Sequence, residues 1–142
     1  MRPALFDTSV YIAALRQGHD AILALRRLTP EAPLWLSAIV LEELYAGVGD
    51  RDRAVIGRLE RDMNKINRLL VPNLGDWTQA GKVLNRLAAK YHYEKIGQGR
   101  LTNDALIATS AGRLGIRVLT ANARDFEKLA EFRAFEWEVA SL

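Results

Sequence analysis

Residues 4–16 read ALFDTSVYIAALR, and this stretch indicates the fold. Its first three residues form a short apolar run that stops at Asp7, which predicts a buried strand. Residues 8–16 then carry apolar side chains in a pattern typical of a helix. A buried strand that leads directly into a helix is the unit from which parallel sheets with helical layers are built.

The same alternation of strands and helices continues along the chain. Apolar runs predict further strands at 34–36, 69–71 and 117–120 and an edge strand at 135–139. Helices are predicted at 20–28, 38–48, 51–67, 76–91, 102–114 and 124–131, with an exposed loop at 94–100. The pattern predicts an α/β fold, a three-layer α/β/α sandwich with a central, mostly parallel sheet.

Length and composition favour one soluble globular domain spanning residues 1–142. The chain is 49% hydrophobic and 26% charged, and charged residues interrupt every apolar run before it reaches the roughly 20 residues of a membrane helix. The first apolar stretch is too short for a secretory signal, so a cytoplasmic location is the simplest interpretation. The absence of cysteine excludes disulfides, and with only His19 and His92 a zinc site is not expected.

Positive charge is concentrated in one part of the chain. The net charge is only +3, but residues 82–124 hold eight Lys and Arg against two acids, Glu94 and Asp104. Such a segment suits phosphate binding, and a set of solvated helix faces explains it equally well.

Four acidic residues fall where a parallel sheet binds ligands, outside the carboxyl ends of its strands. Asp7 follows the first strand, Glu43 lies in the helix after the second, and Asp104 begins a later helix. Asp125 follows the strand at 117–120. Carboxylates brought together would repel one another, and a divalent cation would relieve the repulsion. Oxygen ligands favour Mg²⁺ or Mn²⁺.

Each acid also has a structural interpretation when it is considered alone. Asp7 is a suitable helix cap, Glu43 next to Glu42 fits a solvated helix face, Asp104 fits a first helical turn, and Asp125 fits a turn or a cap. Other chemistries lack their motifs: the sequence holds no phosphate-binding P-loop and no G-x-S-x-G nucleophile elbow.

Four segments, in this order, resemble PIN-domain ribonucleases, and most closely the VapC-type toxins of bacterial toxin–antitoxin pairs. They are LFDTSVYIA at 5–13, LSAIVLEELYAGV at 36–48, LTNDALIATSAGRLG at 101–115 and VLTANARDFEKL at 118–129. The similarity extends over residues 4–138 and implies a PIN-like fold.

The resemblance implies a role for particular residues. It assigns Asp7, Glu43, Asp104 and Asp125 to the metal, and it favours Glu43 over Glu42 because Glu43 precedes a Leu and lies four residues before a Gly. Asn122 would be a neutral ligand or would position a water. The residues expected to hydrogen-bond the acids or their waters are Thr8, Ser9 and Thr120.

The implied activity is Mg²⁺-dependent hydrolysis of RNA phosphodiester bonds, with Lys95 and Arg100 holding flanking phosphates. The implied partners are a second copy of the chain in a homodimer and an antitoxin protein. Two other functions stay open at this point: a non-catalytic RNA-binding domain of the same fold, and a DNA-directed nuclease that uses the same acids.

Overall fold

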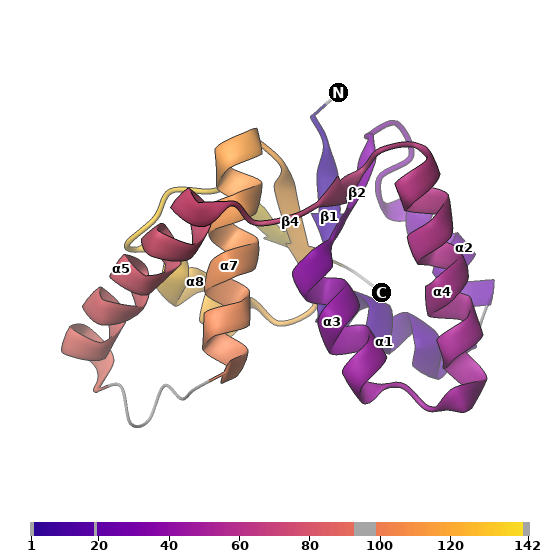
Figure 1. The fold of residues 1–142 in the computed structure, drawn as a ribbon, viewed down its shortest axis with the longest axis horizontal. Coiled ribbons are helices and arrows are strands. Elements are labelled where there is room, and N and C mark those ends of the chain that lie inside the picture. The colour runs from indigo at the N-terminus through magenta and orange to yellow at the C-terminus, as the bar shows by residue number, and fades with distance from the viewer. Residues whose placement is uncertain (1, 19, 93–98, 141–142) are drawn as a thin grey trace.

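The computed structural model describes residues 2–18, 20–92 and 99–140. A five-stranded sheet runs through the middle of the molecule in the order β3-β2-β1-β4-β5, and every neighbouring pair of strands is parallel (Figure 1). The strands are β1 (Ala4–Phe6), β2 (Leu34–Ser37), β3 (Leu69–Leu70), β4 (Arg117–Thr120) and β5 (Trp137–Val139). The predicted α/β class with a parallel central sheet is confirmed.

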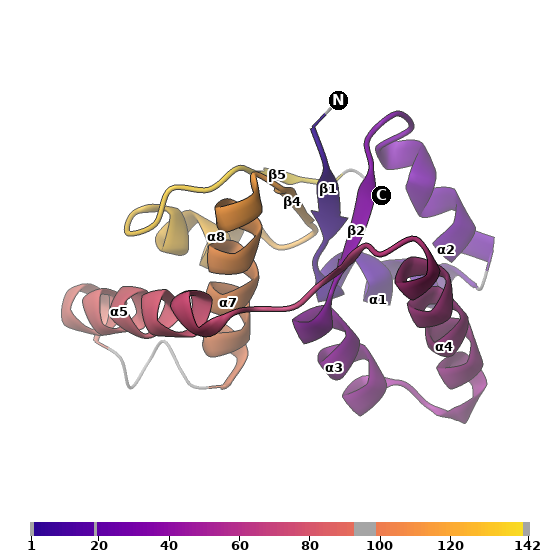
Figure 2. The same cartoon turned by 45° about the horizontal axis from the view of Figure 1, so that its top comes forward.

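Helices cover both faces of this sheet. One layer holds α1 (Thr8–Gln17), α2 (Asp20–Ala24), the 3₁₀ helix η1 (Leu25–Leu28), α3 (Ala38–Gly47) and α4 (Asp50–Lys65). The other layer holds α5 (Leu74–Tyr91), α7 (Gly99–Leu114) and α8 (Ala123–Ala130). Figures 1 and 2 show the two groups on opposite sides of β1, β2 and β4, as the three-layer prediction required. Within the described residues, no helix has the length and hydropathy needed to cross a bilayer.

The hydrophobic core lies between the sheet and both helical layers. All three residues of β1 are inaccessible to solvent, and Tyr11 of α1 packs edge-on against Phe6. On the other face, α7 presents the small buried side chains of Ala105, Ala108 and Ala111. Small side chains allow this helix to approach the sheet closely, which fixes its position relative to the carboxyl ends of the strands.

Several elements differ from the sequence prediction. The edge strand predicted at 135–139 is β5 at Trp137–Val139, two residues shorter at its start. Local capping explains two of the other differences. The helix predicted at 20–28 is α2 followed by η1. The segment ends at Thr29, which precedes Pro30. The N–H of Thr29 donates to the carbonyl of Arg26 (3.1 Å), the hydrogen bond typical of a 3₁₀ turn. Helix α5 begins two residues early, because Asn73 caps it. Helix α7 begins at Gly99, so the end of the predicted loop is helical, and its residues 94–98 lie outside the described residues.

The order of the strands creates a crevice at one edge of the sheet. The chain moves outward from β1 to β2 and β3, and then returns to place β4 on the other side of β1. The connections that leave β1 and β4 therefore go to opposite faces, and the carboxyl ends of these two strands flank an opening. Open parallel sheets bind their ligands at such a reversal.

Candidate active site

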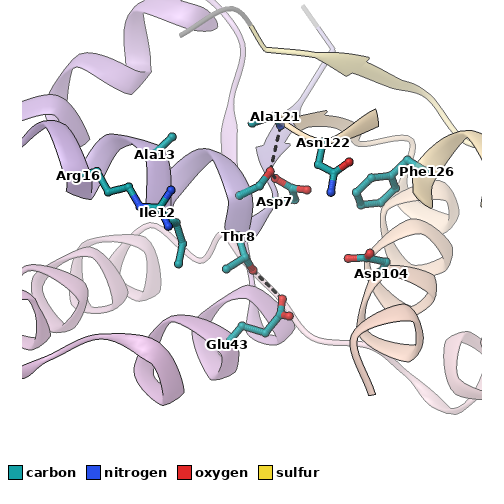
Figure 3. Close-up of a pocket in the computed structure, with 11 residues that line it drawn as sticks. Asp7, Thr8, Ile12, Ala13, Arg16, Glu43, Asp104, Ala121, Asn122 and Phe126 are labelled. Carbon is teal, nitrogen blue, oxygen red and sulfur yellow. Dashed lines mark hydrogen bonds between the residues drawn. The ribbon is translucent and has the colours of Figure 1, made fainter. Parts of the chain in front are cut away.

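A cavity of about 530 Å³ opens at this reversal of strand order. Its walls come from α1, α3, α7, and the turn between β4 and α8 with the start of α8. The lining residues are Asp7, Thr8, Ser9, Ile12, Ala13, Arg16, Glu43, Asp104, Ala121, Asn122 and Phe126. Figure 3 shows the carboxylates of Asp7, Glu43 and Asp104 around one space, each on a different element.

Asp7 is held at the end of β1 by hydrogen bonds to both of its carboxylate oxygens. Oδ1 accepts from the hydroxyl of Ser9 (2.5 Å) and from the backbone N–H of Val10 (3.3 Å), so Asp7 also caps α1. Oδ2 accepts from the hydroxyl of Thr120 on β4 (2.6 Å). Asp7 therefore caps α1 through Oδ1 and binds β4 through Oδ2, so its capping role is compatible with a role in the site.

Burial and hydrogen bonding act on the pKa of Asp7 in opposite directions. The residue is only 5% exposed, and the loss of water disfavours its charged form. Hydrogen bonds from Ser9, Thr120 and the backbone favour the charged form, but burial is the larger effect and the pKa of Asp7 lies above its ordinary value of 3.8. A cation in the cavity would offset this unfavourable burial of charge.

The two neighbouring glutamates of α3 point in different directions. Glu43 is partly buried, lines the cavity, and accepts a hydrogen bond from the hydroxyl of Thr8 (2.6 Å). Glu42 is exposed and contacts the side-chain amide of Asn103 (3.3 Å) on α7. Of the two, Glu43 is the one that the structure places beside Asp7 in the cavity.

Asp104 and Asn122 complete the polar part of the wall. Asp104 lies in α7 and is 9% exposed. Asn122 caps α8 by accepting from the N–H of Arg124 (3.3 Å), and its own N–H donates to the hydroxyl of Thr120 (2.9 Å). Thr120 therefore links the turn that holds Asn122 to the carboxylate of Asp7.

The remaining predicted residues lie elsewhere. Asp125, in the first turn of α8, is not among the residues that line the cavity, and its role stays a prediction. Lys95 lies outside the described residues, and so does the side chain of Arg100. As the side chains stand, no three His, Cys, Asp or Glu residues of the described part of the chain are close enough together to hold a metal ion. The acids share a cavity without converging on one point in it.

Several cavity residues were not predicted from the sequence. Ile12 and Arg16 follow Thr8 at intervals of four along α1, so all three lie on the helix face that borders the cavity. Phe126 of α8 forms an apolar wall opposite them. The helical spacing from Thr8 was a usable signal for Ile12 and Arg16. A search limited to acids at strand ends does not consider the other residues on this helix face.

The basic segment contributes less free charge than its composition suggests. Three of its eight cations form ion pairs with acids elsewhere in the chain: Lys90 with Glu131, Arg113 with Asp76, and Arg117 with Glu138. These side chains join elements of the fold, which supports the structural interpretation for this part of the segment.

The pattern of residues 4–132 matches the family model described as the PIN domain. The chain belongs to the PIN domain family. The matched region contains every wall of the cavity, including Asp7 at its start and Phe126 near its end. No curated protein matches the sequence significantly.

Solved structures share this fold over nearly the full length of the chain. The DNA-bound VapBC of Salmonella typhimurium matches with a TM-score of 0.67, 23% identity and 98% coverage of each chain. VapBC-1 of nontypeable Haemophilus influenzae gives 0.64, 23% and 96% of each chain. VapBC-5 of Mycobacterium tuberculosis, a member of the VapBC toxin–antitoxin family, gives 0.55, 21% and 100% of each chain. At these identities the similarity concerns the fold of the PIN domain.

The donor atoms of this PIN domain suit a hard divalent cation. The cavity offers carboxylates from Asp7, Glu43 and Asp104 and an amide from Asn122, and among the described residues that line it none carries sulfur or imidazole. Oxygen ligands of this kind select Mg²⁺ or Mn²⁺ over softer metals. The buried charge of Asp7 gives an additional electrostatic reason for a cation to bind there.

Proposed function

We propose that this PIN domain is a Mg²⁺- or Mn²⁺-dependent endoribonuclease and the toxin of a toxin–antitoxin pair in the cytoplasm. The observation that carries the proposal is the shared cavity of Asp7, Glu43 and Asp104. Three elements distant in sequence deliver one carboxylate each to the reversal of strand order. A structural role for each acid alone does not account for their common location.

In this proposal Asp7, Glu43 and Asp104 hold the metal, with Asp125 as a fourth acid and Asn122 as a neutral ligand or a support for water. A bound Mg²⁺ would polarise the phosphodiester and lower the pKa of a water. Ser9 and Thr120 fix the direction of the Asp7 carboxylate, and Thr8 does so for Glu43. Pre-positioned carboxylates need little rearrangement when the ion and the substrate bind.

The choice of RNA, and the contact of Lys95 and Arg100 with its phosphates, follow from the resemblance to VapC-type toxins. Cleavage of a mixed single-stranded RNA and of a DNA with the same sequence tests this choice directly. We expect RNA to be cut with Mg²⁺ and to remain intact with EDTA. Preferential cutting of the DNA would identify a DNA-directed nuclease. Metal-independent binding of RNA with no cleavage would identify the non-catalytic alternative.

Variants of the acids show whether cleavage comes from this cavity. Asp7→Asn and Asp104→Asn should each lower cleavage by at least about 100-fold, the scale expected when preorganised electrostatic stabilisation is lost. Glu127→Gln, at an exposed position of α8, is the matched control. Near wild-type cleavage by Asp7→Asn would place the active site elsewhere.

The proposed partners are a cognate antitoxin and a second copy of this chain. The solved structures of similar fold include VapBC toxin–antitoxin proteins, which supports the antitoxin. Exposed apolar side chains at the start of α5, Leu74 (79%) and Trp77 (53%), support a homodimer. Induction of this chain should arrest bacterial growth, and the product of the adjacent reading frame should relieve the arrest. Equal arrest by Asp7→Asn would separate toxicity from nuclease activity.

A further inference from the structure

A second cavity of about 300 Å³ adjoins the acidic one. It lies between the end of α1 and the turn from α3 to α4. Ile12 and Arg16 line both cavities, so the two form neighbouring parts of one surface that begins at Asp7 and continues along α1. A chain-like ligand bound in the acidic cavity can extend into the second one only across these two residues.

Arg16 is suited to bind an anion at this boundary. It is exposed, and no carboxylate of the described part of the chain forms an ion pair with it. Eight residues of helix, about 12 Å, separate it from Thr8 along the axis. In Figure 3, Arg16 lies on the side of Asp7 away from Asp104. An anionic group that leaves the acid-lined space on this side would therefore pass the guanidinium of Arg16.

The second cavity differs chemically from the position of Arg16, where the two cavities meet. Leu15 and Val48 give it apolar walls, and Gly47 and Gly49 leave space where side chains would stand. Such a pocket suits the sugar and base of a nucleotide better than its phosphate.

We propose that the substrate strand runs from the acidic cavity over Ile12 and Arg16 into the second cavity. Arg16 binds the phosphate next to the cleaved one, and the adjoining nucleoside occupies the pocket formed by Leu15, Gly47 and Val48. This inference rests on the proposed nuclease function and adds to it a direction for the substrate and a positioning residue that is distinct from the acids.

The first test is binding of a labelled single-stranded RNA at several salt concentrations, with Ca²⁺ in place of Mg²⁺ to suppress cleavage. Arg16→Ala should weaken binding about tenfold. It should also make the negative slope of log K against log salt shallower by roughly 0.7, the value for one phosphate contact to a single strand. Arg16→Lys should keep most of the slope, because it keeps the charge. Arg27→Ala, at an exposed position of η1 that lines neither cavity, is the matched control.

The second test fills the pocket. A Cβ at Gly47 meets no atom within 4 Å, so Gly47→Leu should fold normally and place a side chain at the second cavity. Gly81 of α5 is equally open and exposed, and Gly81→Leu is the control. RNAs extended by single nucleotides on one end or the other should gain affinity for the wild type on one end only. Gly47→Leu should remove that gain, and Gly81→Leu should retain it.

The outcomes separate this inference from the function on which it rests. An unchanged salt slope in Arg16→Ala, with wild-type cleavage that depends on Asp7, would overturn the path and leave the nuclease intact. A normal end-dependent gain in Gly47→Leu would overturn the assignment of the pocket. If the wild type cleaves no RNA but Arg16→Ala still reduces the salt dependence of binding, the path is supported and the nuclease is rejected.

Discussion

At the scale of single residues, Asp7 shows how a buried carboxylate is both stabilised and left in need of a counter-charge. Three hydrogen bonds satisfy its oxygens, yet its burial still raises its pKa. The folded protein therefore binds a proton at Asp7 more tightly than the unfolded chain does. Between pH 3.8 and the folded-state pKa, stability falls as the pH rises, and the loss persists at neutral pH.

We expect Asp7→Asn to raise the melting temperature at pH 7 in EDTA, and to raise it less at pH 4. Asparagine still caps a helix and carries no charge to desolvate. Each kcal/mol gained would raise the melting temperature by roughly 2–8 °C. Thermal melts of the wild type and the variant across this range measure the effect, with Glu127→Gln as the control. A gain that does not depend on pH would mean that desolvation of charge is not its cause.

Thr120 offers a second test at this scale, because its buried hydroxyl serves two partners at once. It donates to Asp7 and accepts from the N–H of Asn122. Thr120→Val keeps the shape and leaves both partners unsatisfied, which should cost about 1–3 kcal/mol of unfolding free energy in urea. Thr120→Ser retains the hydroxyl and should recover most of the loss. Wild-type stability in Thr120→Val would show that the hydroxyl does not stabilise the fold.

Sequence analysis reached the acids of the site but missed its basic residue. Asp7 was predictable because the end of a buried strand is readable from local patterns. Asp104 was identified too, but its predicted place in the first turn of its helix was wrong, because α7 begins at Gly99. Helical spacing from Thr8 pointed to the face of α1 that holds Arg16, but that this face borders the cavity depends on how α1 packs against α3. Asp125 has the right local position in its turn, yet the orientation of α8 leaves it off the cavity wall.

At the scale of elements, one polar cluster joins α5 to α7. Asn73 and Asp76 cap α5 reciprocally, with distances of 2.8 and 2.9 Å. The carboxylate of Asp76, only 3% exposed, also accepts two bonds from Nε of Arg113 (3.0 and 3.1 Å) on α7. Because α7 carries Asp104, this cluster helps to set where one wall of the acidic cavity stands.

Variants of this cluster should be destabilising and mutually dependent. Asn73→Ala removes one half of the capping box and should cost about 1 kcal/mol. Asp76→Asn also weakens the pairing with Arg113 and should cost about 2–4 kcal/mol. The double variant should cost less than the sum, since both residues belong to one network. Urea denaturation measures all three, with exposed Gln79→Ala as the control. Strict additivity would show that the two residues act independently.

The boundaries of an element were predicted accurately where residues next to it in the sequence determine them. Strand β1 and helix α1 match the prediction closely, because a buried run followed by an N-cap encodes both boundaries. The edge strand β3 has two residues, one fewer than predicted, since Val71 is 63% exposed and precedes Pro72, which has no N–H to donate. The start of α5 depended on recognising Asn73 and Asp76 as a reciprocal cap.

At the scale of the whole molecule, the exposed apolar face of α5 predicts self-association. Leu74 and Trp77 lie three residues apart on this helix, so they share a face. The wild type should be a dimer at micromolar concentration by size exclusion with light scattering. Leu74→Glu or Trp77→Glu should shift the protein to the monomer, raising the Kd at least about tenfold, the equivalent of 1.4 kcal/mol.

Ile66→Glu is the control for this prediction, because Ile66 is also exposed (48%) but caps the end of α4, in the other helical layer. A wild type that is monomeric at all concentrations would contradict the homodimer. Loss of the dimer in the control as well would mean that added charge, and not this face of α5, controls association.

The reversal of strand order also determines when the site can exist during translation. Asp7 and Thr120 are hydrogen-bonded across 113 positions of the sequence, and Phe126 closes the last wall. A ribosome adds roughly 5–20 residues per second, so several seconds separate the synthesis of the first acid from that of the residue that orients it. A nascent chain has the first acid early, and it lacks a finished cavity until residues 120–126 have been added. The order of synthesis thus delays the complete site until well after its first carboxylate has been made.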